Sequence, residues 1–145
     1  MIRVLPLAAA ALLLTACGSS SKPAANETRQ LPTADRTSIQ TVPDHILGKP
    51  FLPGGTIAHY QKGSTAYDLF VAQFPTATDA AIALANLEGA IKGARLVRGL
   101  GGYFGSDAGR TIFVFPMDRW IGGVIGLPPP ESEQAARVLI ARFQP

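Results

Sequence analysis

Short apolar runs that end at proline or glycine constrain the fold of residues 51–145 more than any other feature of the sequence. Residues 66–74 are rich in aromatic and β-branched side chains, which favours a strand with both faces largely covered, and Pro75 ends this strand. Similar runs bounded by turn residues predict five strands in all, at residues 56–61, 66–74, 94–104, 111–115 and 119–127.

Two other segments have the periodicity of amphipathic helices. In the first, Thr76 and Asp79 supply an N-cap and an acidic first turn, Gly93 fits a C-terminal glycine, and the apolar stripe is Ala80, Leu84, Leu87 and Ile91. The second begins near Glu131 and ends near Phe143, with a stripe of Ala135, Ala136, Leu139 and Phe143. Both helices should pack their apolar stripes against the predicted strands.

The element order β-β-α-β-β-β-α predicts an α+β fold, with an antiparallel sheet of about five strands and both helices packed on one face. Residues 71–84 weakly resemble residues 124–139, since each segment reads as a strand, a proline stop and an amphipathic helix. This similarity indicates a possible internal duplication. The alternative is coincidence, because many apolar strands end at proline.

The first seventeen residues have the layout of an export signal. A basic start at Arg3 precedes an apolar run of eleven residues, Val4 to Leu14, which is too short for the ~20 residues of a membrane-spanning helix. The following Leu14-Thr15-Ala16-Cys17 resembles the lipobox of bacterial lipoprotein precursors. The resemblance implies a signal peptide over residues 1–16, recognition of Leu14, Thr15 and Ala16 by the signal peptidase, and diacylglycerol attached to Cys17.

The resemblance to a lipobox also implies a location in the cell envelope. Gly18, rather than Asp, follows Cys17, so the resemblance implies an outer membrane location facing the periplasm in a Gram-negative cell. In a cell with one membrane, the same anchor would place the domain on the outer face of that membrane. Cys17 is the only cysteine, which excludes an intramolecular disulfide and a multi-cysteine metal site in this chain.

Residues 17–50 should connect the anchor to the domain. Residues 18–38 are rich in Ser, Thr, Pro and Asn, a composition typical of a disordered tether. Residues 39–50 contain four apolar residues and two prolines that prevent a long regular element, so they form either an ordered lead-in strap or a segment that orders on a partner. We therefore expect the globular domain to span residues 51–145.

The charge balance argues against nucleic acid as a partner. The whole chain has a formal charge of +3, but residues 51–145 hold 8 Lys and Arg against 7 Asp and Glu. Lys92, Arg95 and Arg98 form a local basic cluster, which fits either anionic lipid headgroups or charge compensation at a helix end. The expected partners are the membrane, through the lipid anchor, and an unidentified envelope protein.

No motif in the sequence indicates a metal, a cofactor or a catalytic group. His45 and His59 lack a second ligand at metal-binding spacing, and the glycine-rich segment 99–105 fits a strand or hairpin better than a phosphate-binding loop. Asp68 stands out in an apolar strand. It should face solvent, line a small polar site, or pair with a cross-strand arginine from the set Arg98, Arg110 and Arg119.

Three functions are compatible with these observations. The first is a non-enzymatic interaction or accessory module on a lipid anchor. The second is a carrier of a small apolar or amphipathic ligand, which would need a cavity between the sheet and the helices near the aromatic residues Tyr103, Phe104, Phe113, Phe115 and Trp120. The third is a small hydrolase, which would require Asp68, His59 and a Ser or Thr to converge in the fold.

Overall fold

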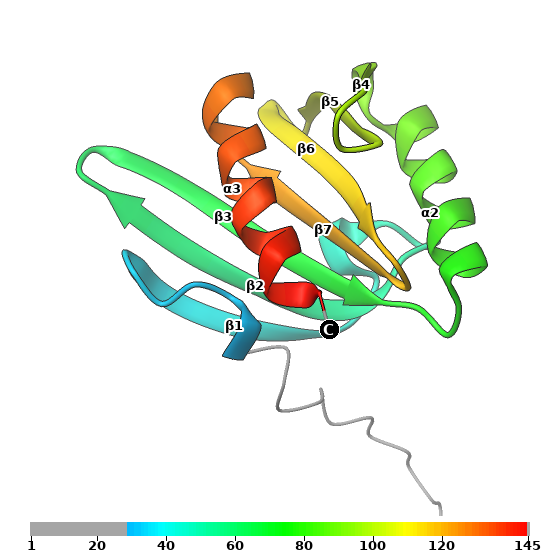
Figure 1. Ribbon diagram of the computed structural model, residues 1–145, viewed down its shortest axis with the longest axis horizontal. Coiled ribbons are helices and arrows are strands. Elements are labelled where there is room, and N and C mark those ends of the chain that lie inside the picture. The colour runs from blue at the N-terminus through cyan, green and yellow to red at the C-terminus, as the bar shows by residue number, and fades with distance from the viewer. Residues whose placement is uncertain (1–28, 145) are drawn as a thin grey trace, which may run out of the picture.

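A computed structural model describes residues 29–144 as one antiparallel sheet with two helices (Figure 1). The sheet has seven strands in the order β1-β2-β3-β7-β6-β5-β4. The strands are β1 (Arg36–Asp44), β2 (Pro53–Lys62), β3 (Thr65–Gln73), β4 (Lys92–Val97), β5 (Gly102–Asp107), β6 (Arg110–Met117) and β7 (Trp120–Ile125). The helices are α2 (Ala77–Ala90) and α3 (Pro129–Phe143), and a short 3-10 turn, η1 (Ile46–Gly48), joins β1 to β2. The predicted α+β class with an antiparallel sheet is confirmed.

The two helices lie on opposite faces of the sheet, so the expectation that both cover one face is wrong. Phe70 and Ala72 of β3 pack in a core with α2, which we call the α2-side core. Their neighbours Leu69 and Val71 pack in a second core with α3, the α3-side core. Because successive side chains of a strand point to opposite faces, the sheet is the middle of three layers. Figure 1 shows α3 crossing in front of the sheet.

The sheet has seven strands rather than five for two reasons. The segment predicted as one strand, residues 94–104, is a hairpin of β4 and β5, in which Gly101 adopts a left-handed φ of 67° at the turn. In addition, β1 pairs with β2. Leu31, which precedes β1, is fully buried. The sheet and core therefore begin before position 51, and residues 29–38 are ordered where a disordered tether was expected.

Both helices start close to the predicted positions. The Thr76 hydroxyl accepts a hydrogen bond from the Asp79 backbone N–H at 3.1 Å, as expected of an N-cap. Helix α3 has no side-chain cap and begins with proline, whose missing N–H costs nothing in the first turn. Ser132 anchors this first turn, because its hydroxyl donates to the Leu127 carbonyl oxygen at 2.9 Å.

Gly122 and Gly123 of β7 permit large aromatic rings to lie directly on the backbone. A Cβ atom on Gly122 would lie 2.7 Å from Cε2 of Phe115, and one on Gly123 would overlap the ring of Phe70 on the other face. The strand pairs without a register shift on both sides. Of the two possibilities for a glycine pair in a strand, a bulge and a close approach, the structure has the close approach.

The N-terminal predictions lie outside the part of the chain that the structure describes. These are the signal peptide, the lipobox residues Leu14, Thr15 and Ala16, and the attachment site Cys17. Within residues 29–144, neither helix has the length and apolar character needed to cross a membrane. The internal duplication stays a prediction.

Candidate functional site

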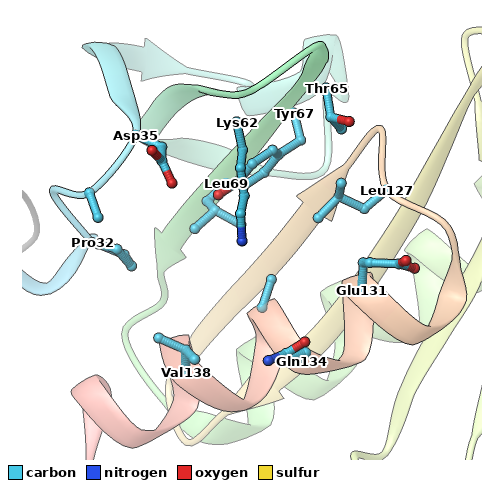
Figure 2. Close-up of a pocket in the computed structure, with 12 residues that line it drawn as sticks. Pro32, Asp35, Lys62, Thr65, Tyr67, Leu69, Leu127, Glu131, Gln134 and Val138 are labelled. Carbon is cyan, nitrogen blue, oxygen red and sulfur yellow. The ribbon is translucent and has the colours of Figure 1, made fainter.

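A groove of about 430 Å³ lies between α3, the β2–β3 hairpin and the segment that precedes β1 (Figure 2). This volume falls within the roughly 300–1,000 Å³ of typical small-molecule sites. The groove is lined by Pro32, Ala34, Asp35, Lys62, Thr65, Tyr67, Leu69, Leu127, Glu131, Gln134, Ala135 and Val138. None of these residues was singled out as functional from the sequence pattern.

The helical wall of the groove comes from the side of α3 next to its buried residues. Ala136 and Leu139 are fully buried against the sheet. Glu131, Ala135 and Val138 recur at spacings of four and three residues, which places them along one side of the helix and facing the groove. Val138 is 46% exposed. This wall is therefore available to a ligand.

The segment before β1 forms the opposite wall and is held by backbone hydrogen bonds. The Tyr60 hydroxyl donates to the Pro32 carbonyl oxygen at 2.8 Å, and the Gln61 N–H donates to the Asp35 carbonyl oxygen at 2.9 Å. Tyr60 also stacks on Tyr67, with ring centroids 5.0 Å apart. These contacts fix the shape of the groove before any ligand arrives.

Burial raises the pKa of both tyrosine hydroxyls further above neutral pH. It raises the pKa of Tyr60 to about 12, despite the nearby positive charge of Arg36. Burial is also the main cause of the raised pKa of Tyr67, and the carboxylate of Asp35 adds to the effect. At neutral pH the tyrosines therefore contribute neutral hydrogen-bonding groups and aromatic surface, and no charge.

The charged groups of the groove are Lys62, Asp35 and Glu131. Figure 2 shows the Lys62 side chain running past Leu69, with its ammonium group directed toward α3. Within residues 29–144, none of the three charged groups forms an ion pair within 4.0 Å. One ammonium group and two carboxylates are thus free to interact with a polar ligand group, while Leu69, Leu127 and Val138 offer apolar contact.

A second polar cluster lies on the other face of the sheet, around Asp68. The Asp68 residue is only 8% exposed, and its Oδ1 lies 2.6 Å from Nδ1 of His59. Its other oxygen accepts a hydrogen bond of 2.9 Å from Arg110. Of the three arginines proposed as partners, Arg110 is the one that pairs. Its guanidinium passes over Gly126, where any Cβ would lie 2.7 Å from Nη2.

The basic cluster and the glycine-rich segment both lie at the β4–β5 end of the sheet. Lys92, Arg95 and Arg98 are exposed on or beside edge strand β4, and the Arg95 guanidinium lies 5.2 Å from the centre of the Phe104 ring. Whether this cluster faces anionic lipid stays a prediction. The glycine-rich segment 99–105 covers most of the turn after β4 and the first residues of β5, so it belongs to a hairpin and not to a phosphate loop.

The aromatic residues considered for a ligand cavity serve the cores. Phe104, Phe113 and Phe115 are buried in the α3-side core. Tyr103 packs against the α2-side core, and Trp120 meets Phe143 edge to face with centroids 5.0 Å apart. None of them lines the groove. Within residues 29–144, no three His, Cys, Asp or Glu side chains cluster in a way that could hold a metal ion.

No protein-family model matches the sequence, and no curated protein matches it. The fold is similar to the crystal structure of a GTP binding regulator from Thermotoga maritima, with a TM-score of 0.57. The similarity covers 81% of this chain and 84% of that chain, at 15% sequence identity. At this identity the likeness shows a shared fold, and it transfers no activity or site residue.

Proposed function

We propose that this protein is a lipid-anchored envelope protein whose domain binds a small amphipathic ligand in the groove beside α3. The observation that carries the proposal is the groove itself, with its 430 Å³ volume, its apolar walls and three charged groups that form no ion pair within residues 29–144. The proposal combines two of the functions considered from the sequence, the accessory module on a lipid anchor and the carrier of a small ligand. It differs from the carrier first considered, because the ligand lies on the β2–β3 hairpin instead of among the core aromatics.

The lining favours a ligand with one apolar part and one polar head. Leu69, Leu127 and Val138 would cover an alkyl chain or ring, since burial of apolar area contributes about 25 cal/mol per Å². Lys62 would pair with an anionic head group, and the two carboxylates at the edges would accept hydrogen bonds from an ammonium or hydroxyl group. A single-chain lipid with a zwitterionic head meets all three requirements.

The ligand of the structurally similar protein is not part of this proposal. That protein is described as a GTP binding regulator, but segment 99–105 of this chain is part of the β4–β5 hairpin and no helix begins there to receive a phosphate. Residues 29–144 therefore supply no glycine-rich phosphate loop for GTP.

The groove is tested by placing a charge on its apolar wall. Val138→Asp should weaken binding of a dansyl-labelled fatty acid, followed by fluorescence, by about tenfold or more, because covering a valine side chain with the ligand contributes about 1.5 kcal/mol. The matched control is Ile82→Asp, which adds the same charge at a 57% exposed residue of α2 on the opposite face. Equal affinity of the two variants, or no binding by the unaltered chain, would reject the groove as the site.

The lipid anchor is tested at Cys17. Cys17→Ser should abolish incorporation of labelled palmitate and leave uncleaved precursor, because the sulfur that receives diacylglycerol is gone. No other cysteine can substitute for it. A mature-sized protein that still fractionates with membranes would contradict the anchor. Fifteen residues separate Cys17 from Pro32, so an anchored groove could reach at most about 50 Å from the point of attachment.

A further inference from the structure

Three adjacent strands bring a serine, a histidine and an aspartate into one row. Ser38 of β1 is the register partner of His59 in β2, and His59 is the register partner of Asp68 in β3. Directly opposed residues of an antiparallel pair point to the same face. Phe70, two residues after Asp68, packs in the α2-side core, so the row lies on the α2 face, away from the groove.

His59 is oriented by a buried carboxylate. Its Nδ1 lies 2.6 Å from Oδ1 of Asp68, whose side chain is 12% exposed. An ionised carboxylate can only accept hydrogen bonds, so Nδ1 carries the hydrogen and Nε2 is left as the acceptor of the neutral ring. Arg110 bonds the second carboxylate oxygen at 2.9 Å, which holds Asp68 in position from the other side. This is the arrangement in which a third group orients a general base.

Ser38 completes the row on the exposed side of His59. It lies on the edge strand, is exposed to solvent, and follows a register shift between Arg36 and Ser38. Opposed Cβ atoms are about 4.5–5.5 Å apart, so a serine hydroxyl can reach an imidazole nitrogen across the pair. The structure shows no hydrogen bond between the side chains of Ser38 and His59. Contacts of this kind are often long before substrate binds.

The edge strand also provides hydrogen-bond donors next to Ser38. Along a strand, successive backbone N–H groups point alternately toward each neighbour, and within residues 29–144 only β2 pairs with β1. One N–H of the consecutive residues Ser38 and Ile39 therefore points away from the sheet. An unpaired N–H at this place can stabilise negative charge on a carbonyl oxygen that is attacked by Ser38.

We propose that Ser38, His59 and Asp68 form a site that hydrolyses small acyl esters with water. His59 Nε2 takes the Ser38 proton while Oγ bonds to the ester carbonyl carbon. The protonated imidazole then gives this proton to the departing alcohol as the C–O bond breaks. Water adds to the acyl-serine, its proton passes through Nε2 to Oγ, and a carboxylic acid leaves. Asp68 and Arg110 are positioning residues that keep Nε2 directed to this task.

The proposal goes beyond the ligand-binding function and departs from the expectation of a non-enzymatic protein. It meets the condition set from the sequence for a hydrolase, the convergence of Asp68, His59 and a Ser or Thr. The groove lies on the opposite face of the sheet. Variants of the row and of the groove can therefore be examined separately, and the failure of one proposal leaves the other intact.

The experiment treats the full chain with a biotinylated fluorophosphonate and identifies the modified residue by peptide mapping. Ser38 should be the labelled residue, and Ser38→Ala should abolish the labelling. Thr41→Ala is the matched control, because Thr41 is an exposed hydroxyl residue of the same strand on the other face. The Thr41→Ala variant should be labelled at Ser38 to the same extent as the unaltered chain. Absence of labelling, or labelling that persists in Ser38→Ala, would overturn the proposal.

A second measurement separates catalysis from structure. The chain should hydrolyse p-nitrophenyl acetate, and His59→Ala should lower kcat/KM about 100-fold, the lower end of what general base catalysis contributes. Added imidazole should restore part of the rate in His59→Ala but none in Ser38→Ala, since a free base can replace the ring and not the nucleophile. Equal hydrolysis by the unaltered chain and both variants would reject the catalytic role.

Discussion

Gly123→Ala places a methyl group where the ring of Phe70 already lies. Gly123 is in β7, and its neighbour Phe70 in β3 is fully buried in the α2-side core. A Cβ on Gly123 would overlap three atoms of the Phe70 ring, Cε1, Cζ and Cδ1. The ring cannot move toward solvent, because residues of α2 and β6 pack in the same core. The substitution therefore forces a shift of the backbone or of a closely packed aromatic side chain.

The expected loss of stability is about 2–3 kcal/mol. Overpacking of a core by one methyl group costs about 1–3 kcal/mol, and the upper part of this range applies because the ring is enclosed. Replacing glycine by alanine also lowers the conformational entropy of the unfolded chain. This stabilises the folded state by about 0.4–1 kcal/mol, and the expected loss of about 2–3 kcal/mol already includes it. For a domain of about 100 residues this corresponds to a fall in Tm of about 10 °C.

Urea unfolding followed by circular dichroism measures the effect, with two comparisons. Gly89→Ala makes the same chemical change in α2, where no atom lies within 4 Å of the new Cβ, and should stabilise the protein by about 0.5–1 kcal/mol. In a Phe70→Leu background, Gly123→Ala should cost less than about 1 kcal/mol, because the ring is gone. The overlap would be refuted if Gly123→Ala left the free energy of unfolding unchanged. It would also be refuted if Gly123→Ala destabilised the Phe70→Leu background as much as the unaltered chain.

Two further predictions follow from single contacts. Thr76→Ala should destabilise the protein by about 1 kcal/mol in urea unfolding, because it removes the acceptor for the Asp79 N–H, whereas Thr76→Ser should keep most of the stability. Since burial raises the pKa of Tyr60 from 10.0 to about 12, unfolding should become easier as pH rises between these values, where the unfolded chain ionises and the folded one does not. Tyr60→Phe should reduce this pH dependence, and a Tyr60 that ionises near pH 10 in the folded state would contradict it.

The two-sided burial of the sheet could be read from the sequence, although the helix placement was predicted wrongly. Residues 69–72 are buried without alternation, and so are residues 112–115. Such runs indicate strands that are covered on both faces. Two helices on one face would leave half of these side chains in water, so consistent use of this pattern would have placed α2 and α3 on opposite faces. What the pattern could not show was β1, whose exposed polar residues resemble a tether.

The pairing of His59 with Asp68 could also have been derived from the sequence. Gly63 and Ser64 form the two-residue connection of the β2–β3 hairpin, in which Lys62 pairs with Thr65 and Gly63 has a φ of 60°. Counting outward from this turn sets His59 opposite Asp68. The partner Ser38 could not be found in this way, because its register depends on β1 and on an irregularity after Arg36.

The groove depends on where the helices end relative to the sheet, which local sequence does not specify. The main helix contacts are with β4 to β7, so the β2–β3 hairpin extends beyond both helices, as Figure 1 shows at the left. On one face of this hairpin Tyr67 and Leu69 line the groove, and on the other His59 and Asp68 form the polar row. Side chains on this hairpin are fixed by the sheet but left partly open by the helices. A rigid strand pair with accessible faces is where a small domain can hold ligand-binding or catalytic groups in fixed positions, and this explains why both candidate sites of the protein include residues of β2 and β3.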